Sequence, residues 1–329
     1  MQYRYIGKQR LKVSAIGYGC PPFQGRLSEA DEKQAIAVLH RAIDIGVNFI
    51  DTADHNNGNN EELLAKVLKD RRSEVVLTTK FGNLRGQPWA EGREVDGRPQ
   101  YMSWALENSL RRLQTDTIDL YYLHRVDPKV PIEETVGGMV RFIEQGKVRH
   151  IGLSEAGPET LRRAAAVYPV AAVQSEYSLW TRDYERTTIP VVRDLGIGYV
   201  AYYALGRGIL GGGYKDFASL GPKEAQRRGP RFYEENFQHN LRLVDQLQAI
   251  AAAKRCTVAQ LALAWILHQG DFFVPIPGTY KISHLESNAA AADVELNADE
   301  LAAIDKIFPQ QGAAAGARHE RDRSKELNI

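Results

Sequence analysis

The sequence predicts an α/β fold in which eight strand–helix units close into a (β/α)8 barrel. Short apolar runs alternate with amphipathic helical stretches along the 329 residues. Several of these runs are continuously apolar, which is typical of parallel strands that are buried on both faces. The units average roughly 40 residues, the size of a barrel unit with inserted loops. A doubly wound open sheet is the alternative that this pattern leaves open.

The elements follow one another in a regular order, beginning with a short hairpin predicted over 3–13. The predicted barrel strands are Ser14–Gly17, Phe49–Asp51, Val75–Lys80, Ile118–His124, His150–Ser154, Ala172–Glu176, Gly198–Tyr202 and Phe273–Ile276. Two polar, glycine-rich segments, 83–100 and 206–235, follow the third and seventh of these strands. Long loops on a compact barrel are more often functional than idle.

Helix starts are predicted from N-terminal capping patterns, in which a side-chain oxygen accepts a free backbone N–H of the first turn, and from proline at the first helical position. These patterns are Ser28-x-x-Asp31, Asn60 followed by Glu61 and Glu62, Pro158 after Gly157, Thr257-x-x-Gln260 and Asn297-x-x-Glu300. Acidic residues in a first turn also suit the helix dipole.

Domain organisation and composition indicate one globular unit, 1–311, followed by a tail, 312–329, that is predicted to be solvated and partly disordered. Lysine and arginine number 42 and acidic residues 41, so bulk attraction to nucleic acid is excluded. No stretch approaches the roughly 20 apolar residues of a membrane span, and the start lacks a secretory signal. Two cysteines, Cys20 and Cys256, form no disulfide framework or zinc motif. We therefore expect a cytoplasmic protein with a small-molecule substrate and no metal.

Polar residues stand at the carboxyl ends of the predicted strands, where parallel barrels carry their active sites. In chain order they are Asp51, Lys80, His124, Ser154 with Glu155, Gln174 and Tyr202. Each alone has an ordinary structural explanation, such as a surface lysine or a hydrogen-bonded core histidine. Their convergence on one barrel mouth favours a functional site.

Long segments of the chain also resemble the aldo-keto reductase superfamily from end to end. They are GVNFIDTAD (46–54), VVLTTKFG (75–82), DTIDLYYLHRVD (116–127), GKVRHIGLSE (146–155), VQSEYSL (173–179), GRGILGG (206–212) and IPGT with HLESNAAA (276–292). The resemblance implies a (β/α)8 barrel with a nicotinamide cofactor lying extended across its mouth.

The family's usual catalytic set is Asp, Tyr, Lys and His, and the resemblance assigns three of these roles to Asp51, Lys80 and His124. The family tyrosine is missing. Asn56 stands where it belongs, no tyrosine lies between Asp51 and Glu61, and the loop is about one residue shorter than usual. An amide cannot release a proton near neutral pH. His55 and His124 are the titratable groups expected near this mouth.

The absence of the family tyrosine, which would act as the general acid, affects which class of substrate the site suits. An imine nitrogen is basic enough to be protonated before hydride arrives, so an imine suits a site that lacks a strong acid. Carbonyl reduction is the reaction that family resemblance favours. We therefore predict an NAD(P)H-dependent reductase of C=N or C=O bonds. The alternatives are a barrel that binds NADPH without turnover, and redox-neutral chemistry on a bound cofactor.

The cofactor site is better preserved, and the resemblance assigns each of its parts. The cofactor residues are Ser154, Glu155 and Gln174 around the nicotinamide carboxamide, Tyr202 against the ring, Leu205, Gly206 and Gly208 along the pyrophosphate, and Gly278, Thr279, Lys281, Glu286 and Asn288 at the adenosine end. Lys281 favours NADPH over NADH, because a 2′-phosphate needs positive partners. The substrate-pocket candidates are His55, Trp89, Tyr101 and Trp180.

Overall fold

The computed structural model describes residues 1–21, 27–54, 58–88, 90, 92–222, 224, 228–319 and 328. Eight parallel strands follow one another in a single sheet, in sequence order from β3 to β10. They are β3 (Tyr18–Gly19), β4 (Phe49–Asp51), β5 (Val76–Phe81), β6 (Ile118–Leu123), β7 (Val148–Ser154), β8 (Ala172–Glu176), β9 (Gly198–Tyr202) and β10 (Phe273–Pro275). The backbone N–H of Gly17 donates to the Pro275 carbonyl at 2.9 Å, which joins the two edges. The predicted (β/α)8 barrel is confirmed and the open sheet is wrong.

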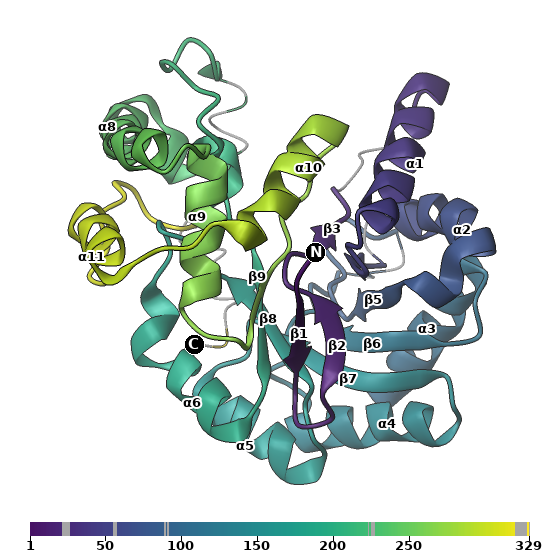
Figure 1. Ribbon diagram of the computed structural model, residues 1–329. Coiled ribbons are helices and arrows are strands. Elements are labelled where there is room, and N and C mark those ends of the chain that lie inside the picture. Colours follow the sequence, from purple (N-terminus) through teal and green to yellow (C-terminus); the bar gives the residue numbers. More distant parts are fainter. Residues whose placement is uncertain are drawn as a thin grey trace.

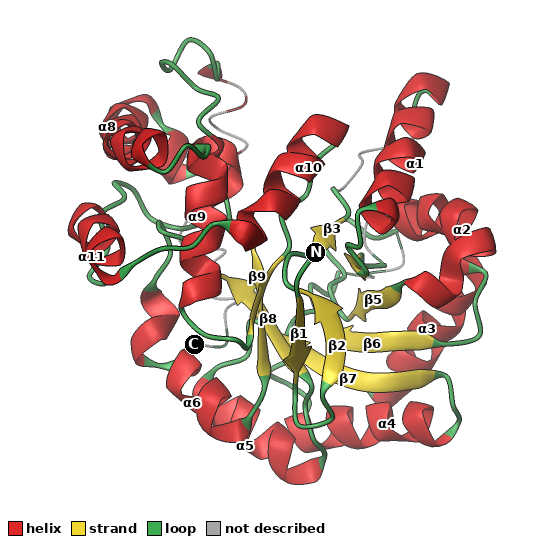
Figure 2. Ribbon diagram, in the orientation of Figure 1, coloured by secondary structure: helices red, strands yellow, loops and turns green. Residues whose placement is uncertain are grey.

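Helices surround the curled sheet (Figures 1 and 2). In the described part of the chain they are α1 (Glu29–Asp44), α2 (Asn59–Arg71), α3 (Pro99–Leu113), α4 (Ile132–Glu144), α5 (Pro158–Val167), α6 (Thr188–Leu195), α8 (Glu234–Ala253), α9 (Val258–His268), α10 (Ile282–Ala290) and α11 (Ala298–Ile307). Short 3-10 turns are η2 (Arg72–Glu74), η3 (Asp183–Arg186), η4 (Gly206–Gly211), η5 (Pro230–Phe232) and η6 (Ala291–Asp293).

The predicted helix caps are confirmed at α1, α5, α9 and α11. Ser28 accepts the backbone N–H of Asp31, α5 begins at Pro158, and both predicted capping boxes form. The start of α2 was predicted wrongly, because Gly58 occupies the cap position and Asn60 lies inside the first turn. The Asn60 amide instead donates to the carbonyls of Cys20 and Pro21, which ties α2 to the end of β3.

The first barrel strand was also placed wrongly, at 14–17. Ser14 ends the second hairpin strand, and the barrel begins at Tyr18, which pairs with Ile50. The reason is side-chain hydrogen bonding: the Ser14 hydroxyl accepts the N–H groups of Asn48 and Phe49 at 3.2 and 3.3 Å. These bonds hold Ser14 at the bottom of β4, before the chain enters the barrel wall.

A two-stranded hairpin, β1 (Tyr3–Ile6) and β2 (Leu11–Ser14), covers the amino-terminal end of the barrel. Ile6 and Val13 are fully buried and belong to the same apolar cluster as barrel-interior residues. A Cβ on Gly198 would lie 2.5 Å from the Cβ of Ile6, so glycine is needed at that contact. The closed lower end leaves the carboxyl ends of the strands as the open face.

Side chains alternate between the barrel interior and the helix layer along each strand, as the period of two requires. On β6, Leu120 and Tyr122 lie in the interior cluster, whereas Tyr121 and Leu123 pack with the surrounding helices. The same alternation puts Thr78 and Lys80 on the inward face of β5. This face supplies the candidate site.

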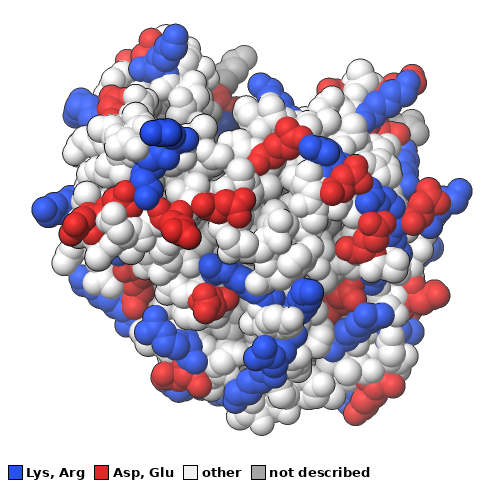
Figure 3. Space-filling view, viewed as in Figure 1, with Lys and Arg blue, Asp and Glu red and all other residues white. Residues whose placement is uncertain are grey.

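Three global features bear on the expected partners. No single helix among the described residues could cross a membrane by length and composition, although α8 and α9, bent by 86°, pass that test as a pair. Acidic and basic side chains are interspersed over the face in Figure 3. Among the residues with described positions, no group of three or more His, Cys, Asp or Glu side chains could hold a metal ion.

Candidate active site at the carboxyl end of the barrel

The centre of the site is a buried ion pair between neighbouring strands. The Lys80 ammonium donates to Asp51 Oδ2 at 2.5 Å, with the lysine side chain 4% exposed and the aspartate 7%. Thr78 Oγ1 and Gln174 Nε2 donate to the other carboxylate oxygen, at 2.5 and 2.9 Å. Lys80 also donates to the Thr52 carbonyl at 2.7 Å. Asp51, on β4, is therefore held by side chains from two other strands, β5 and β8.

Sequence reasoning missed two members of this centre, Thr78 and Tyr122. Each lies two residues before a predicted site residue, Lys80 and His124, and so faces the same side of its strand. The strand period was the signal that could have found them. The Lys80 ammonium lies 5.7 Å from the centroid of the Tyr122 ring. Burial, together with the charge of Asp51, raises the pKa of the Tyr122 hydroxyl well above its usual range, so this hydroxyl keeps its proton.

His124 and Ser154 lie at the carboxyl ends of β6 and β7, at the same end of the barrel as the ion pair. His124 is partly buried, and its backbone N–H donates to the Phe81 carbonyl at 2.7 Å. The guanidinium of Arg125 donates to the His124 carbonyl at 2.7 Å and to Ser154 Oγ at 3.3 Å. Arg125, which the sequence did not single out, thus links these two strand ends.

Three predicted residues, His55, Asn56 and Trp89, lie outside the described residues. The other two predicted pocket aromatics lie in different layers. Tyr101, in α3, packs partly buried against the helix–sheet core, with its ring 5.7 Å from that of Trp104. Trp180 follows β8, is 2% exposed and contacts Phe232 edge-on. Of the two, only Trp180 lines a small cavity beside Glu176.

A second polar cluster occupies the rim beyond β7 and β8, where the predicted nicotinamide contact Glu155 lies. Glu155 has a left-handed backbone, with φ of 51°, and its carboxylate accepts the N–H of Glu176 at 2.9 Å and the hydroxyl of Tyr184. Arg318 completes this cluster, with hydrogen bonds to both carboxylates. The Glu155 carboxylate therefore faces protein partners in this structure.

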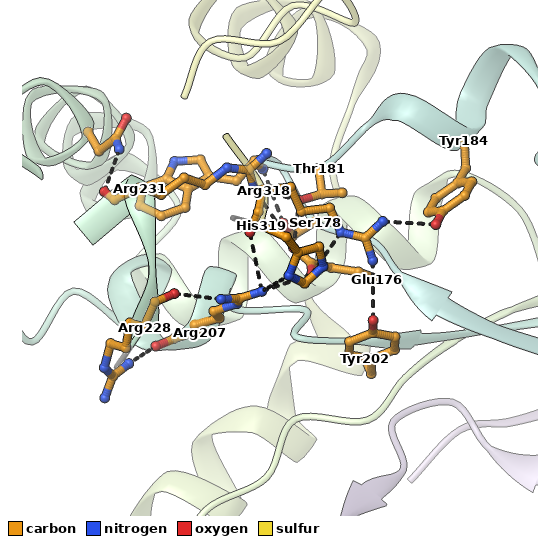
Figure 4. A network of polar contacts seen from close by, with 12 residues as sticks. Glu176, Ser178, Thr181, Tyr184, Tyr202, Arg207, Arg228, Arg231, Arg318 and His319 are labelled. Carbon is orange, nitrogen blue, oxygen red and sulfur yellow. Dashed lines mark hydrogen bonds and ion pairs between the residues drawn. The ribbon is translucent and has the colours of Figure 1, made fainter. Parts of the chain in front are cut away.

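The expectation of a solvated tail is wrong at Arg318, although Gly312 and Ala317 are exposed. The Arg318 side chain is only 10% exposed, because it lies between the buried carboxylates of Glu155 and Glu176. Figure 4 shows it beside Glu176, Tyr184 and Tyr202. Before it, Ala315 exchanges two backbone hydrogen bonds with the Asn240 side chain, at 2.8 and 3.0 Å. Asn328 Oδ1 accepts from the Gly157 N–H and the Thr160 hydroxyl, and so caps the start of α5.

The residues predicted for the rest of the cofactor lie along the loops after β9 and β10. Leu205 is partly buried, and its carbonyl accepts the N–H of Gly208, while Gly206 and Gly208 have φ of 56° and 101°, where glycine is favoured. The segment Gly206–Gly211 forms 3-10 turns rather than the start of a helix. Tyr202 packs against the barrel-interior cluster.

The adenosine end is formed by the start of α10. Thr279 Oγ1 accepts the backbone N–H of Lys281, whose exposed side chain stands at the N-cap. Glu286 pairs with Arg41 of α1 at 2.6 Å, and Asn288 is buried. A Cβ on Gly278 would lie 2.5 Å from the Gly19 carbonyl, so only glycine fits there.

Behind the barrel wall, two acidic side chains, Asp54 and Glu61, are buried where α2 and α3 meet β5. Glu61 is fully buried and accepts from Thr79 Oγ1 and Arg112, at 2.6 and 2.7 Å. Asp54 is 2% exposed, and in the described part of the chain its Oδ1 has no hydrogen-bond partner. Burial, together with the charge of Glu61, raises the pKa of Asp54 well above its usual range.

An Asp54→Asn variant is expected to gain stability over the wild type as pH rises. A raised folded pKa means that the native state binds the Asp54 proton more tightly than the unfolded chain, whose pKa is about 3.9. The resulting stabilisation of the wild type is fully present below the pKa that Asp54 has in the unfolded chain, and it is lost as pH rises through the pKa that Asp54 has in the folded protein. Urea unfolding of both proteins at about pH 5 and about pH 8 measures the difference. The exposed Asp70→Asn is the control, and an Asp54→Asn effect that is equal at both pH values contradicts the assignment.

Comparison with known proteins agrees with this architecture. A model described as the Aldo/keto reductase family matches residues 15–308. The Glycine max protein "Probable aldo-keto reductase 1" is 44% identical over 319 residues, covering 95% of this chain and 90% of that protein. Glycerol dehydrogenase from Gluconobacter oxydans has a TM-score of 0.85 at 27% identity, covering 93% of this chain and 94% of that one.

A second solved structure is an aldo/keto reductase from Klebsiella pneumoniae in complex with NADP and acetate. It has a TM-score of 0.73 at 31% identity, covering 94% of this chain and 96% of that one. Since the family model spans most of the sequence and the Glycine max relative covers nearly all of it, the chain belongs to the aldo/keto reductase family.

Proposed function

We propose that this protein is an NAD(P)H-dependent oxidoreductase that transfers hydride to a C=N or C=O bond of a small organic molecule. The observation that carries the proposal is the Asp51–Lys80 pair, buried at the open end of the barrel in a member of this family. A buried ion pair contributes little net stability, so its retention favours a role in function. The Klebsiella relative solved with NADP supports the choice of cofactor.

The residues of the far rim fit a dinucleotide. Glycines at 206 and 208 permit the close backbone approach that a diphosphate needs. Lys281 stands at the amino-terminal end of α10, where its ammonium and the helix dipole both favour negative charge. We therefore assign Leu205–Gly208 to the diphosphate and Lys281 to the 2′-phosphate of NADPH.

Bound NADPH would supply the hydride, and the chain's own residues would manage charge and protons. Asp51, restrained by Thr78 and Gln174, fixes the Lys80 ammonium in a site shielded from water. A fixed positive charge in such a place stabilises negative charge that develops on the reacting oxygen or nitrogen. His124, at the end of β6, is the titratable group that would orient the substrate or donate its proton.

Asn56 makes the proton donor of this enzyme non-standard. Its amide can hydrogen-bond a substrate but cannot supply a proton. An imine reaches the site already protonated on nitrogen, whereas a carbonyl requires a proton from His124 or His55. Both substrate classes therefore remain in the proposal, and they differ in their need for a histidine.

Purified protein mixed with NADPH and a panel of aldehydes, ketones and cyclic imines tests this function. We expect loss of NADPH absorbance with at least one of these classes. Fluorescence titration of NADPH gives its affinity for the wild type and for a Gln174→Ala, Tyr202→Ala double variant, which is expected to bind weakly. Tight binding with no turnover on the whole panel would instead indicate a barrel that only binds the cofactor. Unchanged affinity in the double variant would place the site elsewhere.

Lys281→Ala is expected to weaken NADPH binding while leaving NADH binding unchanged. The loss is about 1 kcal/mol, at the low end for a charge-assisted contact because the lysine is exposed to solvent. Parallel titrations with the two cofactors measure it. His284→Ala, on the same helix, is the matched control. Equal losses for NADPH and NADH would contradict a contact with the 2′-phosphate.

We also propose a cytoplasmic location and a small-molecule partner. Both cysteines, Cys20 and Cys256, are free thiols. Free thiols without a disulfide framework suit a reducing compartment.

A further inference from the structure

We propose that Arg318, carried by the C-terminal tail, is a positioning residue for the nicotinamide end of the site. It acts by holding Glu155, Glu176 and Tyr202 in place from outside the barrel. This inference rests on the proposed function, because it concerns the part of the mouth assigned to the nicotinamide ring.

The Arg318 guanidinium makes four hydrogen bonds, to partners from three strand ends and a connecting turn. It donates to Glu155 Oε1 at 2.8 Å and to Glu176 Oε2 at 3.0 Å. It also donates to the hydroxyls of Tyr184 and Tyr202, at 2.8 and 3.2 Å. Figure 4 shows the side chain lying between Glu176, Tyr184 and Tyr202. A single tail residue thus joins the ends of β7, β8 and β9.

Charge balance makes this contact strong. The side chains of Glu155 and Glu176 are at most 3% exposed, and they meet through the Glu176 N–H. Burial alone would raise the pKa of Glu176, but the guanidiniums of Arg318, Arg207 and Arg231 outweigh it and lower that pKa to about 2. Arg207 and Arg231 lie 3.7 and 3.8 Å from Glu176, farther than Arg318. Removing Arg318 leaves two buried carboxylates that repel each other.

The tail is held in place on the barrel near this contact. The Asn240 side chain in α8 forms two hydrogen bonds with the backbone of Ala315. Gly316 packs closely against α8 and η5: a Cβ at position 316 would lie 2.8 Å from the Asn236 amide nitrogen and from the Pro230 carbonyl oxygen. Asn328 N–H donates to the Glu155 carbonyl at 3.3 Å. Arg318 is therefore held at the rim by neighbouring residues of the tail that are themselves packed against or hydrogen-bonded to the barrel.

The consequence for the cofactor follows from Tyr202. Its ring packs in the barrel interior, and its hydroxyl accepts from Arg318, which leaves the ring fixed at the end of β9. An aromatic ring that must stack on nicotinamide gains affinity when it is already restrained before binding. Glu155 and Glu176 define the wall on either side. Arg318 would thus set the shape of the pocket without touching the cofactor itself.

Fluorescence titration of NADPH against the full-length wild type and Arg318→Met tests the proposal. We expect at least about tenfold weaker binding in the variant, as for removal of one member of a buried charge cluster. Arg318→Lys keeps the positive charge but loses the planar guanidinium that binds several partners at once. Its NADPH affinity should therefore fall between those of the wild type and Arg318→Met. The double variant Glu176→Gln, Arg318→Met removes the repulsion and should regain much of the lost affinity. Arg186→Met, at an exposed arginine, is the control.

Recovery of NADPH affinity in the double variant distinguishes a positioning role of Arg318 from a role in the stability of the fold alone. If Arg318→Met is folded by circular dichroism and binds NADPH as tightly as the wild type, the proposal is overturned. Tighter binding overturns it as well, since it would make the tail a plug that the cofactor must displace. If Arg318→Met does not fold, Arg318→Lys and the double variant carry the same comparison, and unchanged affinity in both also overturns it. A wild type that fails to bind NADPH contradicts the proposed function instead.

Discussion

Exchange of Lys80 for methionine is expected to lower kcat/KM for reduction by about 10²- to 10⁴-fold, the range for loss of a positioned group that stabilises the transition state. The reason is geometric. The Lys80 ammonium is fixed at 2.5 Å from Asp51 and lies near the Tyr122 ring, at the open end of the barrel. Methionine fills similar space but carries no charge. Steady-state kinetics on the best substrate of the panel measure the loss, with exposed Lys69→Met as the control.

The Lys80→Met exchange also leaves the Asp51 carboxylate without its positively charged partner. An unpaired buried carboxylate costs about 3–5 kcal/mol, and the donors Thr78 and Gln174 keep the loss near the lower figure. The double variant Asp51→Asn, Lys80→Met removes both charges and should recover stability in urea unfolding without recovering activity. A double variant that reduces substrate at the wild-type rate would show that the ion pair has only a structural role.

Asn56→Tyr is expected to raise activity toward simple aldehydes by at least about 10²-fold, because it restores a general acid. A phenol has a pKa near 10, and a neighbouring ammonium favours the phenolate and lowers that pKa. This prediction rests on the proposed function, in which family resemblance implies that a tyrosine at position 56 would lie beside Lys80. On cyclic imines, which need no acid, the added ring should reduce activity by crowding the site. Rates of wild type and variant on one aldehyde and one cyclic imine, between about pH 5 and about pH 9, measure both effects.

Asn56→Phe is the control for bulk, since it adds the ring without the hydroxyl. If the natural reaction is carbonyl reduction with a histidine acid, the wild type already reduces aldehydes, and His124→Ala or His55→Ala abolishes this. A tyrosine variant no faster than the phenylalanine variant on aldehydes, combined with a wild type inactive on imines, would contradict this interpretation of the site.

The barrel could be predicted because its signals are local. Capping boxes at Thr257 and Asn297 lie within four residues and form as expected. Continuous apolar runs in the sequence predict buried parallel strands. The prediction failed at Ser14 and Asn60, where side-chain hydrogen bonds to a distant segment override the local pattern. Such bonds depend on which segments the fold brings together.

The sequence by itself determined the barrel, the convergence of Asp51, Lys80 and Gln174, and the absence of a tyrosine between Asp51 and Glu61. Convergence is predictable because the ends of parallel barrel strands must meet at one mouth. Gln174 as a donor to Asp51, 123 residues away, was decided only by the tertiary structure. So was the burial of Arg318, because an Ala-, Gly- and charge-rich tail reads as solvated. Two carboxylates on neighbouring strand ends attract that guanidinium, and their proximity exists only after the barrel has closed.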